Sequence, residues 1–196
     1  MLFCPGIPML TSQEFRERWC DDDSDSLIVF PPNAFANIAI PDESKTFLTT
    51  SGLPESAAPF LDFRVPDHGA LQTLAELWQL APEYNRYWVV GSNGSGDPLC
   101  IDESCDGQIV YLNHDYNFHR VLINSSVPQL AETLLAFRHL VRETQRQHGE
   151  DAYLDGDVPT DLQQWLLKEI IRIDLAAAHP DCFWSQELEN IRENAK

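Results

Sequence analysis

The chain has 196 residues, 43% of them hydrophobic, and carries 31 Asp and Glu against 13 Lys and Arg, a formal net charge of −18. A surface of this charge repels nucleic acid and anionic membranes; it favours a basic protein partner, although it would also serve solubility alone. The length predicts a single domain over residues 1–196. A chain of this size buries roughly 70% of its unfolded surface, so its core requires neither a disulfide nor a metal.

The N-terminal part of the chain is predicted to combine two short helices with an acidic loop. A capping-box pattern at Thr11–Glu14 starts a helix over Ser12–Trp19. The acidic loop Asp21–Asp25 follows, and then a short strand within Leu27–Phe30. Pro41–Ser51 is predicted to be the second helix, because Pro suits the first turn and its acidic residues suit the positive end of the helix dipole.

The next segment is predicted to enter the main sheet. Apolar and polar residues alternate in Phe60–Phe63, which is typical of a strand. Within Ala70–Gln79, Leu71, Leu74 and Trp78 share one face of a helix, which indicates a short helix packed on the core. The same segment is also compatible with an irregular surface insertion.

The centre of the chain is predicted to be an antiparallel meander. Short runs rich in Val, Ile, Leu and Tyr are each bounded by Gly, Asp, Asn or Ser, as in consecutive strands joined by tight turns. The dipeptide Asp106-Gly107 is a strong hairpin signal. The predicted strands are Tyr87–Val90, Leu99–Asp102, Gln108–Asn113 and Arg120–Asn124.

Three helices are predicted after the meander. Capping-box patterns at Ser126–Gln129 and Thr160–Gln163 each precede an apolar stripe at helical spacing. We expect Trp165 and Ile170 to be core residues of the second of these helices. The predicted helices run from Ser126 to about Arg146, from Thr160 to about Ala178 and from Trp184 to Asn194.

These elements together predict an α+β fold. The expected architecture is a single domain with a twisted, mainly antiparallel sheet and helices from both ends of the chain packed on one face. Its expected parts are an N-terminal helix and acidic segment over 1–40, a helix, the meander sheet and a helix over 41–146, and C-terminal helices over 160–194.

The cysteines and the start of the chain bear on its location. The five cysteines form no CxxC pair, and the first residues contain neither a basic region nor an apolar run of signal-peptide length. No stretch approaches the roughly 18 apolar residues of a membrane span. We expect a cytoplasmic protein with free thiols.

Several patterns are candidates for catalytic, cofactor or metal sites. The glycine-rich run Gly91–Gly96 leads through Asp97 into a strand rather than a helix, so it is interpreted as a hairpin turn and not a phosphate loop. His114 has no positioned nucleophile beside it, and Cys100 lies in an apolar run typical of an inert buried thiol. The acidic residues match no calcium-loop spacing. The sequence therefore predicts no catalytic, cofactor-binding or metal-ligating residues, and a protein that is not an enzyme.

The central stretch resembles the SUKH superfamily. The resemblance rests on YWVVGSNGSGDPLCID at Tyr87–Asp102 and GQIVYLNHD at Gly107–Asp115, and it is supported by Phe47–Pro54 and Ile123–Leu130 and by the Ile-Asp and Phe-Trp pairs at 173–174 and 183–184. This resemblance implies a bacterial immunity protein that binds and neutralises a cognate polymorphic toxin, often a nuclease, and it implies no catalytic residues. The superfamily also contains relatives of the yeast cell-wall-synthesis regulator, so the alternative function is an intracellular scaffold or regulator with no toxin partner.

Acidic side chains are the candidate partner-binding residues. The stretches Asp21–Glu43 and Tyr87–His119 together hold eleven acidic residues and no Lys or Arg. A nuclease toxin must itself be basic to bind phosphate, so an acidic inhibitor can place carboxylates where phosphates would lie. A solvated acidic face that serves only solubility is the alternative. The predicted protein-binding residues are Asp21, Asp22, Asp23, Asp97, Asp102, Glu103 and Asp106.

Overall fold

The structure, a computed structural model, describes residues 10–22, 25–66 and 69–194. It begins with helix α1, Ser12–Trp19, in which the predicted capping box is present: the Glu14 amide donates to the Thr11 hydroxyl, and the Thr11 amide donates to the Glu14 carboxylate. The elements between α1 and the main sheet are β1 (Leu27–Ile28), the 3-10 helix η1 (Pro32–Phe35), α2 (Asp42–Thr50) and β2 (Leu53–Pro54), with β1 and β2 paired antiparallel.

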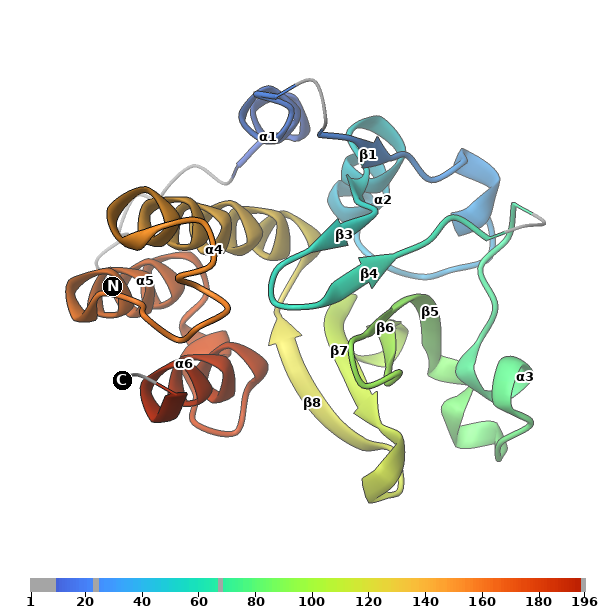
Figure 1. Cartoon of the computed structure of the whole chain (residues 1–196). Helices are drawn as coiled ribbons and strands as arrows, with labels where there is room; N and C mark the ends of the chain where they lie inside the picture. The colour runs from blue at the N-terminus through green and yellow to red at the C-terminus, as the bar shows by residue number, and fades with distance from the viewer. Residues whose placement is uncertain (1–9, 23–24, 67–68, 195–196) are drawn as a thin grey trace, which may run out of the picture.

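An antiparallel meander forms the centre of the molecule (Figure 1). In the described part of the chain it contains six strands, each hydrogen-bonded to the strand before it. Cys100 pairs with Val110 and Ile101 with Ile109, the register of consecutive hairpins. The predicted α+β class and antiparallel sheet are confirmed. The strands are β3 (Ser56–Ala57), β4 (Leu61–Phe63), β5 (Tyr87–Asn93), β6 (Pro98–Asp102), β7 (Gln108–Asn113) and β8 (His119–Asn124).

The pleat of the strands divides their apolar side chains between two faces of the sheet. Leu99 and Ile101 belong to the main core, whereas Cys100, between them, belongs to a smaller cluster on the opposite face. Helices from both ends of the chain cover the first face, as predicted (Figure 1). The second face is partly covered by the short helix α3 (Leu74–Trp78) and the 3-10 helix η2 (Pro82–Arg86), which are separated by three residues.

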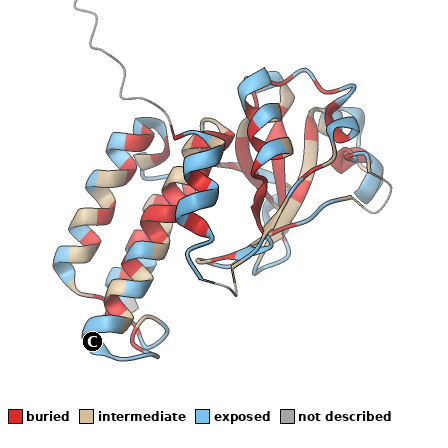
Figure 2. Ribbon diagram, turned by 90° about the horizontal axis from the view of Figure 1, so that it is seen from above, coloured by how far each residue is buried: buried red, intermediate tan, exposed pale blue. Residues whose placement is uncertain are grey.

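The long helices α4 (Val127–His148), α5 (Thr160–Ile173) and α6 (Phe183–Asn194) form a layer beside the sheet. Their buried residues lie on the sides that face each other and the strands, and their exposed residues lie outside (Figure 2). Trp184 is fully buried, 5.6 Å from Phe137 between ring centroids, and its indole N–H donates to Asn124 at 2.8 Å. This aromatic pair ties α6 to α4.

Helix α5 is shorter than predicted. It ends at Ile173, and the 3-10 helix η5 (Leu175–Ala178) follows, because Asp174 leaves the helical conformation and turns its carboxylate to the start of α4. There the amide of Ser125 donates to Asp174 at 2.6 Å and the Ser125 hydroxyl donates at 2.9 Å. A tertiary contact therefore ends the helix where local propensity favours its continuation.

Two finer predictions for α5 are wrong. Its N-cap is Pro159, and the predicted capping box does not form because the Gln163 side chain donates to the Val158 carbonyl instead. Trp165 is only partly buried, with its ring 4.7 Å from that of His139, so it lies at the edge of the core. Ile170 is buried, as predicted.

Candidate partner-binding surface

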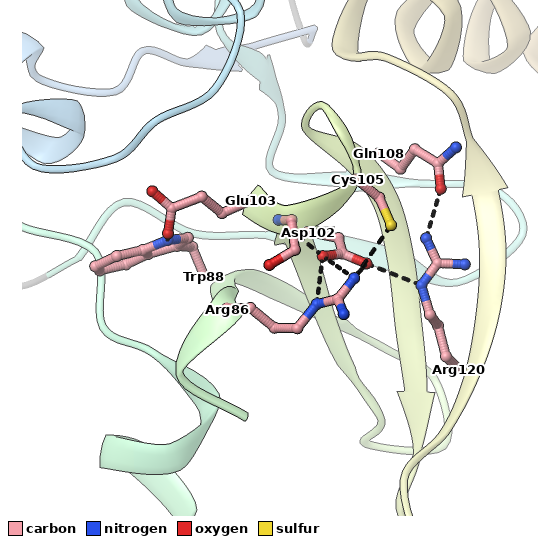
Figure 3. A network of polar contacts seen from close by, with 8 residues as sticks. Arg86, Trp88, Asp102, Glu103, Cys105, Gln108 and Arg120 are labelled. Carbon is pink, nitrogen blue, oxygen red and sulfur yellow. Dashed lines mark hydrogen bonds and ion pairs between the residues drawn. The ribbon is translucent and has the colours of Figure 1, made fainter. Parts of the chain in front are cut away.

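The carboxylate of Asp102, at the end of β6, lies at the centre of a polar network (Figure 3). It is fully buried and accepts hydrogen bonds from Nε and Nη2 of Arg86, both at 2.7 Å, and from Nε of Arg120 at 3.0 Å. The amide of Ser104 donates to the same carboxylate at 3.2 Å. Charge-assisted bonds of this kind compensate the desolvation of a buried carboxylate.

The sheet register explains how this network assembles. Asp102 pairs with Tyr87 on one side and with Gln108 on the other, so Arg86 lies next to its β5 partner. Arg120 reaches over from β8 and also donates to Gln108. Burial opposes the charge of Arg86, but the hydrogen bonds and the negative charge of Asp102 outweigh this effect and raise the pKa of Arg86 above its ordinary value.

Glu103 connects the same turn to the N-terminal half of the chain. One carboxylate oxygen accepts from the amide of Ala39 at 2.6 Å, and the other accepts from the indole N–H of Trp88 at 3.0 Å. Glu103 lies in the 3-10 helix η3 (Glu103–Cys105), which Asp102 caps. Both oxygens of Glu103 therefore make structural contacts within the chain.

Asp97 is buried at the start of β6 and holds a histidine. Its Oδ1 lies 2.9 Å from the His114 amide nitrogen and 2.7 Å from Nδ1 of the His114 ring, and its Oδ2 accepts from the Asn93 side chain at 3.0 Å. Asn93 Oδ1 in turn accepts from the amides of Ser95 and Asp97. The second half of the glycine-rich run therefore forms the β5–β6 hairpin turn, whose backbone is satisfied by Asn93, while Gly91–Asn93 extend β5 beyond the predicted end at Val90.

Asp21 is hydrogen-bonded to helix α4. Arg142 donates to both of its oxygens, at 2.6 and 3.0 Å, and Arg138 donates to it at 2.8 Å. The hydrogen bond from Arg142, followed by the charges of Arg138 and Arg142, lowers the pKa of Asp21 to about 2. Arg138 also contacts Asp25 and the Trp19 carbonyl, so the acidic loop is attached to α4 by its carboxylates.

The structure narrows the set of acidic candidates. Asp97 and Asp102 are buried with their oxygens engaged, so we withdraw both from the partner-binding set. Glu103 is half-buried and engaged on both oxygens. Exposed carboxylates remain at Asp21, Asp22 and Asp106, and Asp23 lies outside the described residues.

Cys100, a candidate nucleophile in the sequence, is fully buried. Burial raises the pKa of the Cys100 thiol, which keeps it protonated and unreactive. Cys100 lies in the small cluster behind the sheet with Leu112 and Val110. Among the described residues, no group of three or more His, Cys, Asp or Glu side chains is placed to hold a metal ion.

An exposed group of aromatic rings lies on the second face of the sheet; we call it the aromatic surface. Trp78 packs edge-on against Phe118 at 5.3 Å between ring centroids and lies 5.8 Å from His114, while Tyr84 packs against Phe118 at 5.4 Å. Trp78 remains 42% exposed and Tyr116 73% exposed. The aromatic surface comprises the packed rings of Trp78 of α3, Tyr84 of η2, His114 of the 3-10 helix η4 (His114–Tyr116) and Phe118, and we include the exposed Tyr116, which lies between His114 and Phe118 in the sequence.

The sequence prediction missed this surface because it placed Trp78 on the core side of a helix with Leu71 and Leu74. Those two leucines are buried, but Leu71 lies before the helix begins, and Trp78 at its last position packs against Phe118 and His114 and stays 42% exposed. A capping box at Thr73, with Glu76 as its partner, fixes the start of this helix and was also missed. The signal was present in the sequence as Thr-x-x-Glu before an apolar run.

The meander, the helical layer on one face and the exposed rings on the other define an α+β protein with a candidate protein-binding surface. The model of the family described as SUKH-4 immunity protein matches residues 11–190. The chain belongs to this family, which confirms the resemblance seen in its motifs. No curated protein and no solved structure shows a significant match to the chain.

Proposed function

We propose that this chain is an immunity protein that binds a cognate toxin and neutralises it by covering the toxin's active surface. The observation that carries the proposal is the match of the SUKH-4 immunity protein model to residues 11–190, nearly all of the described chain. The exposed rings and carboxylates are side chains suited to binding another protein.

We further propose that the toxin is basic, and that it is a nuclease. The net charge of −18 supports this choice, because a protein that grips nucleic acid presents Lys and Arg that an acidic inhibitor can cover. The same charge disfavours binding of this chain to nucleic acid or an anionic membrane. Within the described residues, no helix has the length and apolarity needed to cross a bilayer. Protection of the producing cell places the proposed activity in the cytoplasm.

The test is protection from the candidate toxin domain encoded beside this chain's gene. The domain is expressed from an inducible promoter with and without the chain, and growth is recorded. We expect arrest without the chain, normal growth with it, and a purified complex of the two proteins. A neighbouring product that is harmless, or arrest that the chain fails to relieve, would contradict the proposal and favour the scaffold function.

We also expect the purified chain to have no turnover of its own, because the Cys100 thiol is buried and the sequence contains no nucleophile, phosphate or metal signature. The measurement is activity on a panel of hydrolase and nuclease substrates. Turnover that His114→Ala abolishes and Leu175→Ala retains would show that the chain is an enzyme.

A further inference from the structure

We infer that the aromatic surface is where the toxin binds, and that it takes a toxin segment carrying exposed Lys or Arg side chains. The inference rests on the proposed function and adds to it the contact surface and the chemistry of the segment bound. It moves the expected contact away from Asp97 and Asp102, whose carboxylates are used inside the chain.

The first argument is the cost of exposing these rings. Trp78 and its neighbour Leu77 are 42% and 44% exposed, and leaving this much apolar surface in water is unfavourable for folding. Other exposed apolar side chains, such as Leu154 between α4 and α5 and Leu175 of η5, lie on other parts of the chain, whereas Trp78 belongs to a group of packed rings. Tryptophan and tyrosine are also the residues that most often dominate binding energy at interfaces.

The second argument is that the rings of Trp78, Tyr84, His114 and Phe118 are already ordered by contacts within the chain. Phe118 packs against both Trp78 and Tyr84, and the His114 ring beside Trp78 is held by the buried carboxylate of Asp97. The Thr73 cap fixes the helix that carries Trp78. A surface held in this way loses little side-chain entropy on binding, so more of the contact energy appears as affinity.

The third argument is charge. From Val65 to His119 the sequence contains eight acidic residues and one basic residue, Arg86, whose charge is paired with Asp102. Asp115 is 77% exposed and lies on η4 between His114 and Tyr116. Glu83 is exposed on η2 beside Tyr84. Exposed rings next to carboxylates attract Lys and Arg side chains, because the ring faces make cation–π contacts and the carboxylates carry the opposite charge.

The fourth argument is position. In Figure 1, α3 lies on the side of the sheet away from the layer of α4, α5 and α6. The main core lies between that layer and the sheet, so a partner can cover the aromatic surface without opening it. A partner that bound the acidic loop would instead compete with existing contacts, because Asp21 is already hydrogen-bonded to Arg138 and Arg142.

The experiment measures binding of the purified toxin domain from the neighbouring gene to variants of the full chain. Trp78→Ala and Tyr116→Ala test the rings, and Leu175→Ala is the matched control because Leu175 is as exposed as Tyr116, both at 73%. Asp115→Lys tests the charge. Asp181→Lys is its matched control, since Asp181 is 89% exposed and, like Asp115, lies beside a histidine.

We expect each ring variant to weaken binding by about 30-fold, the loss typical of a central interface residue. Asp115→Lys should slow association by about tenfold and reduce its dependence on salt. The two control variants should bind like the wild type. Melting temperatures confirm that each variant is folded; Tyr116→Ala keeps the test valid even if Trp78→Ala unfolds α3.

Three results would overturn the inference. If the wild type binds and neither ring variant weakens binding, the toxin contacts another surface and the immunity function stands. If the wild type does not bind the toxin domain, the immunity function itself fails. If the wild type forms a dimer that Trp78→Ala dissociates, the aromatic surface serves a second copy of the chain.

Discussion

At the scale of single residues, the acidic side chains of this chain divide into two groups with different physical roles. Asp102 is buried and paired with two half-buried guanidinium groups, whereas Asp106, on the same turn, is exposed. Both were candidates for partner binding on the basis of their position in an acidic stretch. Only the exposed carboxylate is available to another molecule.

Replacing Asp102 by Asn should lower the free energy of unfolding by about 2–3 kcal/mol, because two charge-assisted pairs are lost. The loss is below that of a fully buried pair, since Arg86 and Arg120 can turn toward water. Urea unfolding measures it. Asp106→Asn is the control and should change stability by less than about 0.5 kcal/mol. Equal stability of both variants would show that the network contributes little.

The contact between Asp21 and helix α4 should make part of the stability depend on pH. Arg142 and Arg138 lower the pKa of Asp21 from 3.8 to about 2, so the folded state binds this proton less tightly than the unfolded state. The contribution is present above about pH 4 and is lost as the pH falls toward about 2. It is small, because the carboxylate is about half exposed.

We therefore expect the wild type to melt above Asp21→Asn at neutral pH and the difference to shrink as the pH falls from about 5 to about 2. Melting temperatures across this range measure the effect. The difference in melting temperature between the wild type and Asp106→Asn should not shrink in this way as the pH falls. A constant difference for Asp21→Asn would show that its contact with α4 does not depend on its charge.

At the scale of elements, the packing of the C-terminal helices depends on α6 more than on the outer face of α5. Trp184 of α6 is fully buried between Phe137 and Phe183 and donates to Asn124. Trp165 of α5 contacts the core only with part of its ring. The two tryptophans therefore differ in what they contribute to stability.

Trp184→Ala should cost about 3–5 kcal/mol through lost burial and a cavity, whereas Trp165→Ala should cost about 1–2 kcal/mol. Trp184→Phe should cost about 1–3 kcal/mol, because it leaves the Asn124 oxygen unpaired and removes only part of the buried ring. Denaturant unfolding of the three variants gives these values. A larger loss for Trp165→Ala than for Trp184→Ala would contradict this account of the core.

At the scale of the whole molecule, a net charge of −18 acts over distances longer than any single contact. We expect the association rate with the proposed basic toxin to fall at least about tenfold between roughly 50 and 300 mM salt, because screening weakens electrostatic steering. Rapid-mixing kinetics measure this rate. Asp22→Lys combined with Asp106→Lys should lower the rate at low salt and flatten its salt dependence. A rate that responds neither to salt nor to these changes would indicate that the charge serves solubility.

Local patterns in the sequence were sufficient for the elements and their order. The meander strands, α1 with its cap and the long helices follow from turn residues, capping boxes and apolar spacing, which act between near neighbours in the chain. Strands joined by consecutive tight turns pair with their neighbours in the sequence, so the sequence also predicted the antiparallel sheet. The motifs around the same strands also indicated the SUKH superfamily, which the family match confirms.

Only the tertiary structure decided which polar and aromatic side chains face water. Asp102 is buried because the sheet register brings Arg86 and Arg120, which flank the stretch without basic residues, to one carboxylate. Asp174 ends α5 because its partner is Ser125, far away in the sequence. Trp78 stays 42% exposed because the fold places it against Phe118 and His114 and not in the main core. The charge and spacing of residues in the sequence predict local structure. Whether a side chain is buried depends on residues that are distant in the sequence and that the fold places beside it.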